Sequence, residues 1–218
     1  MINKELTKRI VSSLILIPLS IILVKEGNFL FNIFILICFL ITSYEWHIMS
    51  RKKTYHLLGF FFLLISFFTA YEIRAGESGS YESFVIILLI CIATDIGGYI
   101  FGKIFKGPKL TKISPNKTYS GAIGGYLLTI IFLNLVLGQS YFFLESHDIT
   151  VYFIVFILFI STVSQLGDII ISYFKRLSKV KDTGKIIPGH GGLLDRLDGM
   201  IFAYPSAYLI FKINIFQF

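Results

Sequence analysis

The chain has 218 residues, of which 55% are hydrophobic and only 15% are charged, and its formal net charge is +7. Soluble domains contain about 45–50% apolar and about 25% charged residues, so the composition excludes an ordinary soluble domain and favours a polytopic membrane protein. Cys38 and Cys91 lie inside long apolar runs, which argues against a disulfide framework and against a cysteine-based metal site.

Long apolar segments follow one another along the chain. In order they are Ile10–Val24, Phe29–Ile48, Tyr55–Tyr71, Phe84–Phe101, Ile123–Gly138, Val151–Phe174 and Met200–Phe216. Each approximates the roughly 17–25 residues with which a helix crosses the hydrocarbon layer, and none alternates as barrel strands do. We therefore predict an all-α fold, a polytopic transmembrane bundle of about seven helices that forms one catalytic domain over residues 1–218.

Basic residues are concentrated on one side of these segments. One set of connections holds Lys4, Lys8 and Arg9, then Arg51, Lys52 and Lys53, then five lysines between 103 and 117, then six basic residues between 175 and 196. The opposite set holds only Lys25, Arg74 and Lys212. The positive-inside rule places the richer set and the N-terminus in the cytoplasm. Because topology accounts for the positive charge, we expect no nucleic-acid partner.

Two aspartates fall inside the predicted spans. Asp95 lies eight residues before Lys103, and Asp168 lies seven before Lys175. Both therefore lie roughly 10–12 Å inside a cytoplasmic helix end at about 1.5 Å per residue. An aspartate at the centre of a span costs about 2.5–3.5 kcal/mol on insertion scales, so such residues usually face a cavity or a partner. A structural contact between helices is the alternative for either residue.

The spacing of the carboxylates indicates a metal site. Asp168 and Ser172 are four residues apart and share a helix face, and Asp195 and Asp198 share one if the last helix starts there. Carboxylates that converge from two helices offer oxygen ligands, which suit Mg²⁺ together with substrate phosphates. The absence of clustered cysteine and histidine ligands disfavours zinc.

Cations and glycines surround this acidic centre. The cations are Lys175, Arg176, Lys181, Lys185 and Arg196. An acidic metal pair inside a basic rim is typical of phosphoryl or nucleotidyl transfer, although a single lysine here can equally be a topology signal or a lipid-headgroup contact. The run from Pro188 to Gly192 can bring backbone N–H groups to an anion, and within it His190 fits a structural or phosphate contact better than a base. Gly98 with Gly102, and Gly121 with Gly125, match the small-xxx-small pattern of helix packing.

These residues resemble a known family. Ser172-x-x-Lys175-Arg176, Lys181-Asp182-x-Gly184 and Pro188-x-His190-Gly191-Gly192-x-x-Asp195-Arg196-x-Asp198 resemble the signature of the phosphatidate cytidylyltransferases, or CDP-diacylglycerol synthases. Asp95-x-Gly97-Gly98-Tyr99, Ser114-Pro115-Asn116-Lys117-Thr118 and Gln165-x-Gly167-Asp168 are similar to upstream regions of that family. The family usually has Trp-Glu where this chain has Tyr119-Ser120, and Glu where it has Ile171.

The resemblance implies an enzyme that makes CDP-diacylglycerol and pyrophosphate from CTP and phosphatidic acid, the first committed step of phospholipid synthesis. It implies Mg²⁺ on Asp168, Asp195 and Asp198, with room for a second cation. Ser172 would contact metal or phosphate, and Lys175, Arg176 and Arg196 would hold phosphates. The substrate-binding residues implied are Asp95, Ser114, Lys117, Thr118, Lys181, Asp182, His190, Gly191 and Gly192. We expect a cell (inner) membrane protein with a cytoplasmic active site, and a homodimer as a family expectation.

Other functions remain open at this point. A CTP-dependent kinase of a polyprenol, phytol or similar lipid shares related architecture but transfers the γ-phosphoryl group. A catalytically degenerate family member is a second alternative, prompted by Ile171 and Ser120. A transporter or membrane scaffold is disfavoured because the outer halves of the spans are almost purely apolar. A CDP-alcohol phosphotransferase is disfavoured because Asp198-Gly199 continues into Met200-Ile201-Phe202-Ala203.

Overall fold

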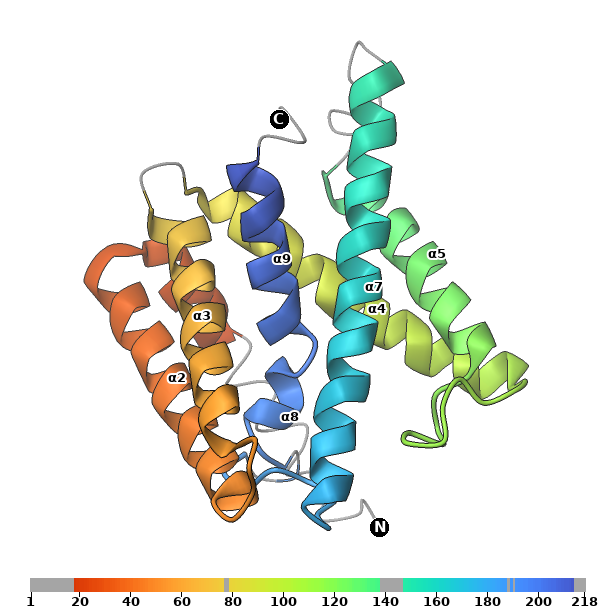
Figure 1. Cartoon of the computed structure of the whole chain (residues 1–218). Helices are drawn as coiled ribbons and strands as arrows, with labels where there is room; N and C mark the ends of the chain where they lie inside the picture. Colours follow the sequence, from red (N-terminus) through yellow and green to blue (C-terminus); the bar gives the residue numbers. More distant parts are fainter. Residues whose placement is uncertain (1–17, 77–78, 138–146, 188, 190, 214–218) are drawn as a thin grey trace, which may run out of the picture. The chain divides into compact units, whose positions relative to one another are not determined.

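The computed structural model describes residues 18–76, 79–137, 147–187, 189 and 191–213, and it is helical throughout its long elements (Figure 1). The helices are α2 (Asn28–Ser50), α3 (His56–Ala75), α4 (Tyr81–Phe105), α5 (Tyr119–Leu137), α7 (His147–Leu177), the short α8 (Leu194–Leu197) and α9 (Met200–Lys212). Residues 18–26 are also helical. Extended pairing in the described residues is limited to two isolated β-bridges. The predicted all-α class is confirmed.

Helices α2, α3, α4, α5 and α7 are long and apolar enough to cross a membrane. Each coincides with one of the predicted segments. Helices α4 and α7 extend beyond the predicted ends at Phe101 and Phe174. The chain is therefore a multi-pass membrane protein. The first predicted segment lies mostly outside the described residues. The 13 residues of α9 reach roughly 20 Å, less than the hydrocarbon thickness, so these two spans stay predictions.

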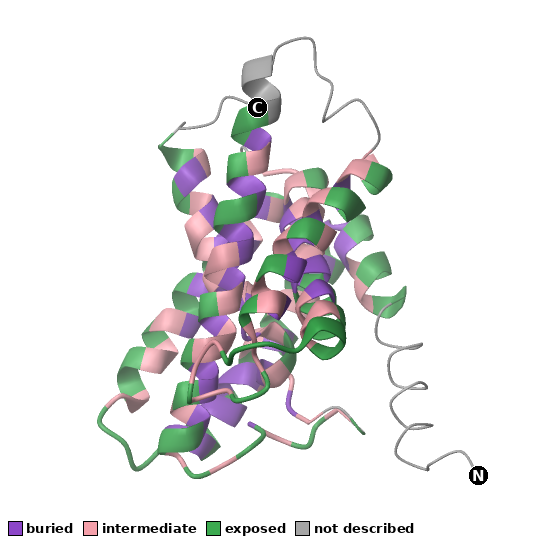
Figure 2. Cartoon of the chain, turned by 90° about the vertical axis from the view of Figure 1, so that its right-hand side faces the viewer, coloured by how far each residue is buried: buried purple, intermediate pink, exposed green. Residues whose placement is uncertain are grey.

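Many large apolar residues of these helices are exposed. Figure 2 marks the exposed positions in green. Phe29 is 73% exposed, Leu57 is 69% exposed and Leu135 is 76% exposed. Apolar surface of this extent is unusual in a soluble monomer and marks contact with lipid or a partner. The exposed faces therefore agree with the membrane class that the composition indicates.

The chain forms two compact units. One contains residues 1–84 and 174–198, and the other contains residues 85–173 and 199–218. In the first unit α3 and α8 both pack on α2. The second unit contains most of α4, α5 and α7 together with α9.

An aromatic cluster in the first unit fixes the start of the segment that carries the signature. Trp46 of α2 is 3% exposed, and its Nε1–H donates to the carbonyl oxygen of His56 at 2.9 Å. The ring of Phe174 lies 5.4 Å from that of Trp46 and 4.7 Å from that of Tyr55, measured between centroids. These contacts tie the end of α7 to α2 and to the start of α3. The position of Phe174, where the signature segment of the first unit begins, is therefore fixed by packing.

Glycines bring α4 and α5 together in the second unit. A Cβ atom placed on Gly121 would lie 2.7 Å from the carbonyl oxygen of Gly98 and 3.3 Å from the Cα of Gly102. A Cβ on Gly97 would lie 2.6 Å from the carbonyl oxygen of Gly124. Only glycine permits this backbone approach, and it is how small residues join membrane helices. The packing role predicted from the spacing of these glycines is confirmed.

A buried hydroxyl network crosses the same unit. Thr94 of α4 is 3.1 Å from Thr129 of α5 and 2.8 Å from Ser161 of α7, measured between the hydroxyl oxygens. Thr129 also donates to the carbonyl oxygen of Gly125 at 2.8 Å. In an apolar setting an unpaired hydroxyl is costly, so mutual pairing holds these three helices in one register.

The two neighbouring glycines of α4 give a matched test of this packing. Gly97→Ala is expected to destabilise the protein by about 1–3 kcal/mol, because its Cβ would meet the backbone of α5. Gly98→Ala is the control, because a Cβ there has its nearest neighbour at 3.8 Å and alanine is the better helix former. Thermal unfolding of both variants in detergent measures the difference, and equal stabilities would contradict the close α4–α5 contact.

Candidate functional site

The signature begins on a helix and continues in an ordered segment. Helix α7 runs to Leu177, so Ser172, Lys175 and Arg176 are helical, although the sequence placed them at the start of a cytoplasmic connection. The helix closes with Lys179 in a left-handed conformation at φ 59°, and the N–H of Val180 donates to the carbonyl oxygen of Lys175 at 3.0 Å. Lys175 therefore lies in the last turn of α7, and its carbonyl oxygen is bound by the N–H of Val180, just after the helix.

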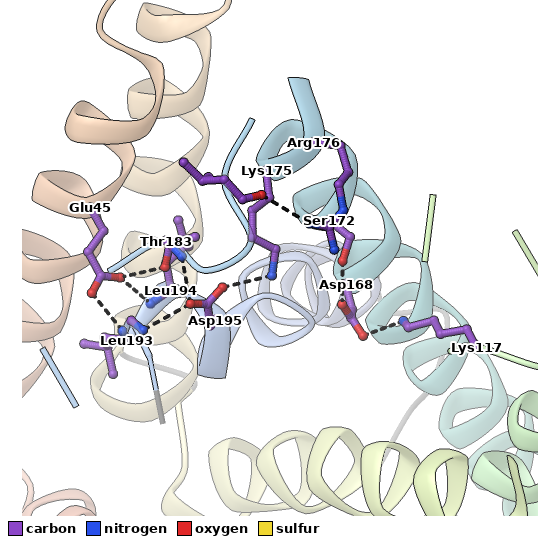
Figure 3. Close-up of polar contacts among 12 residues, drawn as sticks. Glu45, Lys117, Asp168, Ser172, Lys175, Arg176, Thr183, Leu193, Leu194 and Asp195 are labelled. Carbon is purple, nitrogen blue, oxygen red and sulfur yellow. Dashed lines mark hydrogen bonds and ion pairs between the residues drawn. The ribbon is translucent and has the colours of Figure 1, made fainter. Parts of the chain in front are cut away.

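Asp195 lies at the centre of the polar contacts in the first unit (Figure 3). Lys175 Nζ donates to its Oδ1 at 2.9 Å. The backbone N–H groups of Thr183 and Gly192 donate to its Oδ2 at 2.8 Å and 3.0 Å. The side chains of Lys175 and Asp195 are only 10% and 7% exposed. The structure therefore brings Lys175 and Asp195, which lie 20 positions apart in the signature, into direct contact.

Opposing effects act on the pKa of Asp195. Burial raises the pKa of this carboxyl, because it disfavours the charged form. The hydrogen bond and positive charge of Lys175, together with the N–H groups of Thr183 and Gly192, lower it. The lowering effects prevail, and the pKa of Asp195 lies below its ordinary value. The residue is therefore an anion at neutral pH, as a ligand for a divalent cation must be.

A second carboxylate, which sequence reasoning missed, supports the same segment. Glu45 of α2 is 1% exposed. It accepts hydrogen bonds from the N–H groups of Leu193 and Leu194 at 2.9 Å and 2.8 Å, and from the Thr183 hydroxyl at 3.2 Å (Figure 3). Glu45 lies inside a predicted span, just as Asp95 and Asp168 do. A complete survey of carboxylates within the apolar segments would have found it.

The glycines of the segment allow the chain to turn tightly around these two carboxylates. The N–H of Ile187 donates to the carbonyl oxygen of Gly191 at 3.0 Å, and Gly189 and Gly191 have φ of 78° and 88°. Such angles strain any residue with a Cβ. A Cβ on Gly192 would lie 2.2 Å from the Thr183 hydroxyl and 2.6 Å from Glu45 Oε2. Gly191 and Gly192 thus shape this turn, and the substrate contact predicted for them stays a prediction.

The remaining signature residues of the first unit are mostly on the surface. Lys181, Asp182 and Arg196 are exposed. Arg176 is also exposed, and its guanidinium donates to the carbonyl oxygen of Val180 at 3.2 Å. Asp198 follows α8 with helical backbone angles and is 8% exposed. His190 lies outside the described residues.

Asp168 forms a separate group of contacts in the second unit. Lys117 Nζ lies 2.5 Å from Asp168 Oδ2, and the Ser172 hydroxyl donates to Asp168 Oδ1 at 3.3 Å (Figure 3). The ammonium of Lys117 also donates to the carbonyl oxygen of Gln165 at 3.3 Å. The shared face predicted for Asp168 and Ser172 is confirmed. Their pairing with Lys117, far away in the sequence, was not predicted.

The connection from α4 to α5 holds Lys117 in place. Its backbone N–H donates to the carbonyl oxygen of Ser114 at 3.0 Å, and its carbonyl oxygen accepts from the N–H of Leu110 at 2.8 Å. The Thr118 hydroxyl accepts from the N–H of Gly121 at 3.1 Å, at the start of α5. Ser114 and Thr118 therefore support the backbone around Lys117.

Three further positions bear on the predicted site. Asp95 is exposed on α4. Ser120, at a position where the family usually has glutamate, has its hydroxyl within hydrogen-bond reach of Thr118 and the carbonyl oxygen of Lys106. Ile171, the other departure, is 3% exposed. At that position α7 contributes apolar packing, and the carboxylate of this part of α7 is Asp168.

The donor chemistry fits Mg²⁺. Among the described residues, no group of three or more His, Cys, Asp and Glu side chains lies close enough to hold a metal. Mg²⁺ needs fewer protein ligands, because it is usually bound by one or two carboxylates plus waters and substrate phosphates. A carboxylate has about four lone-pair positions, and Asp195 uses three in the hydrogen bonds with Lys175, Thr183 and Gly192. Asp195 therefore has capacity for one further contact.

Comparison with known proteins gives the family. A model of the Cytidylyltransferase family matches residues 55–214. The phosphatidate cytidylyltransferase of Rickettsia prowazekii is 36% identical over 218 residues, and the alignment covers 95% of this chain and 91% of the relative. That of Rickettsia typhi is 35% identical over 214 residues with the same coverage, and that of Brucella suis is 32% identical over 89% of this chain and 70% of its own length. The chain belongs to the Cytidylyltransferase family.

The contribution of the Lys175–Asp195 ion pair can be tested through the free energy of unfolding. Lys175→Met keeps most of the side-chain length but removes the ammonium, which leaves a nearly buried carboxylate without its cation. We expect a loss of about 1.5–3 kcal/mol, the usual contribution of a charged hydrogen bond. Chemical unfolding in detergent measures the change.

The double variant Lys175→Met with Asp195→Asn is the control for this measurement. It removes both charges and is expected to recover part of the lost stability, because the uncompensated carboxylate is gone. A double variant that is less stable than Lys175→Met would contradict the pairing.

Proposed function

We propose that this chain is a phosphatidate cytidylyltransferase, a nucleotidyltransferase that makes CDP-diacylglycerol and pyrophosphate from CTP and phosphatidic acid. The observation that carries the proposal is the cluster in which Lys175, Gly192 and the backbone of Thr183 hold Asp195. The phosphatidate cytidylyltransferases of Rickettsia typhi and Rickettsia prowazekii, which align over 91% of their own length, support it.

The proposed reaction is a substitution at phosphorus. A phosphate oxygen of phosphatidic acid attacks the α-phosphorus of CTP, and the bond from that phosphorus to the oxygen bridging to the β-phosphate breaks. Pyrophosphate leaves with that oxygen. Because the nucleophile is already an anion at neutral pH, little base catalysis is needed. Positioning and neutralisation of charge therefore dominate the proposed mechanism.

The residues of the two clusters have distinct proposed roles. Asp195, kept ionised by Lys175, would bind Mg²⁺. Asp168 and Asp198 as further metal ligands, and Ser172 as a contact to metal or phosphate, stay predictions from the sequence, because no group of three such carboxylates lies close together among the described residues. Bound Mg²⁺ would neutralise charge on the reacting phosphates, and a second cation is compatible with this set. The exposed guanidinium groups of Arg176 and Arg196, together with Lys175, would hold phosphate groups.

Other residues are proposed to bind substrate around these groups. They are Asp95, Ser114, Lys117, Thr118, Lys181, Asp182, His190, Gly191 and Gly192. The ammonium of Lys117 lies beside Asp168, a proposed metal ligand, so it is a candidate contact for a substrate phosphate. A lysine acts as a point charge toward phosphate, so it tolerates either the lipid or the triphosphate as its partner.

The proposed location is the cell (inner) membrane, with the site and the N-terminus on the cytoplasmic side. The uneven distribution of lysine and arginine supports this orientation. CTP would then arrive from the cytosol, while the phosphatidic acid headgroup lies at the same surface. One catalytic domain over residues 1–218, and a homodimer, stay predictions.

A CTP-dependent lipid kinase is the alternative function, and its products differ from those of a cytidylyltransferase. A kinase releases CDP, whereas a cytidylyltransferase releases pyrophosphate. A degenerate family member would release neither. Ile171 and Ser120 motivate that possibility, whereas the hydrogen bonds that orient and charge-pair Asp195 favour a working site.

The direct test is reconstitution with phosphatidic acid and labelled CTP, with Mg²⁺ or with a chelator. Wild type is expected to form a labelled CDP-lipid and pyrophosphate only with Mg²⁺. Asp195→Asn is expected to lower the rate about 100-fold or more, which corresponds to several kcal/mol of lost charge stabilisation. Glu82→Gln makes the same chemical change at an exposed position of α4 and should retain activity. Release of CDP by wild type would refute the proposal, and equal rates for wild type and Asp195→Asn would refute the metal assignment.

The orientation can be tested by labelling with a membrane-impermeant thiol reagent. Cys38 and Cys91 are 9% and 1% exposed, so the native background should be low. Lys112→Cys, in the exposed connection before α5, is expected to react in inverted membrane vesicles but not in spheroplasts. Glu82→Cys, near the opposite end of α4, is expected to show the reverse. Exchange of the two patterns would overturn the proposed orientation.

A further inference from the structure

Glu45 is a fully buried carboxylate whose hydrogen-bond partners among the described residues are all neutral. It is 1% exposed, and it accepts two backbone N–H bonds, from Leu193 and Leu194, and one hydroxyl bond from Thr183. A carboxylate removed from water is costly unless strong donors replace its hydration. The three donors around Glu45 supply that replacement, so they and the carboxylate constrain one another.

The donors to Glu45 alternate with the donors to Asp195. Three consecutive backbone N–H groups are divided between the two side chains. That of Gly192 goes to Asp195, whereas those of Leu193 and Leu194 go to Glu45. Thr183 contacts both carboxylates by itself, because its N–H donates to Asp195 and its hydroxyl donates to Glu45. Both backbone donors of Asp195 therefore belong to peptide segments that Glu45 also holds.

The close packing leaves this arrangement little freedom. A Cβ on Gly184 would lie 2.5 Å from Glu45 Oε1, and a Cβ on Gly192 would lie 2.6 Å from Glu45 Oε2. The carboxylate thus fills the space beside the two glycines. A shift of Glu45 would release both segments at once, and with them the N–H groups that orient Asp195.

We propose that Glu45 is a positioning residue for the reaction. It fixes the backbone at Thr183 and at Leu193–Leu194, and through that backbone it sets the direction of the Asp195 carboxylate. Its effect on catalysis rests on the proposed function, whereas its effect on the backbone does not. Glu45 also lies before the range that the family model matches, residues 55–214, so that match gives it no role.

The first measurement needs no substrate or metal. Hydrogen–deuterium exchange of the purified, ligand-free protein is compared for wild type, Glu45→Gln and Ser43→Ala. In Glu45→Gln an amide N–H group faces donors, so exchange in peptides covering 183–197 is expected to rise about tenfold or more. Exchange in α5 should stay unchanged.

Ser43→Ala is the matched control on the same helix. Ser43 is 8% exposed, and its hydroxyl has no hydrogen-bond partner among the described residues. Its truncation should leave exchange in 183–197 and activity at the wild-type level. A similar rise in exchange for both variants would show a general loosening of α2 and would overturn the proposal.

The second measurement separates positioning from simple structural support. In the CDP-lipid assay, Glu45→Gln is expected to raise the Mg²⁺ concentration for half-maximal activity about 10–100-fold, the usual effect of losing a group that orients a metal ligand. The KM for CTP should change little. Glu45→Asp, which keeps the charge on a shorter side chain, is expected to give an intermediate value.

Thr183→Val keeps the proposal testable if Glu45→Gln folds poorly. It removes only the hydroxyl contact with Glu45 and keeps the backbone N–H to Asp195. We expect a smaller shift in the same direction. If Glu45 acts through Thr183, the two substitutions combined should cost less than the product of their separate effects.

The outcomes distinguish this inference from the proposed function. Unchanged exchange in both Glu45→Gln and Thr183→Val overturns the inference. Raised exchange with an unchanged Mg²⁺ requirement also overturns it, because Glu45 would then be a structural cap. If wild type makes no CDP-lipid, the proposed function fails. The hydrogen-exchange result alone then decides whether Glu45 fixes the backbone of residues 183–194.

Discussion

A buried carboxylate is stable only if donors replace the water it has lost, and this constraint organises the segment between α7 and α9. Asp195 and Glu45 both lie nearly out of contact with solvent. Together they take up five hydrogen bonds from the backbone and hydroxyl groups of residues 183–194 and one from Lys175. The positive φ of Gly189 and Gly191 and the bare Cα of Gly192 follow from this demand, because the chain must turn its N–H groups inward within a few residues.

Features determined by local geometry could be predicted from the sequence. The membrane class follows from composition, and five spans follow from the length of apolar runs. The use of α4 and α5 glycines in helix packing follows from their spacing, because a missing side chain permits close approach whatever its partner is. The spacing does not say which helices meet. Asp168 and Ser172 share a face because four residues make about one turn of any α-helix.

Contacts between distant residues could not be predicted in this way. Thr183 and Glu45 are 138 residues apart, and no spacing rule links a carboxylate in one helix to a turn that follows another. The pairing of Lys117 with Asp168 has the same origin. The predicted end of the sixth segment at Phe174 was short for a physical reason. Apolar content falls there, but the helical hydrogen bonds continue to Leu177, where Lys179 turns the chain.

The partners of the two carboxylates in the first unit give them different capacities. Glu45 is bound by donors that belong to the backbone and to one buried threonine, and these cannot leave without unfolding the turn. Asp195 has two such donors from the backbone and one from a side chain, the ammonium of Lys175. A lysine can swing away when another cation approaches, whereas a peptide N–H cannot. The fold therefore holds Glu45 through groups that belong to the turn itself, and gives Asp195 one partner that belongs to a side chain. That asymmetry is what the proposed roles of Asp195 as a cation ligand and of Glu45 as its support each require.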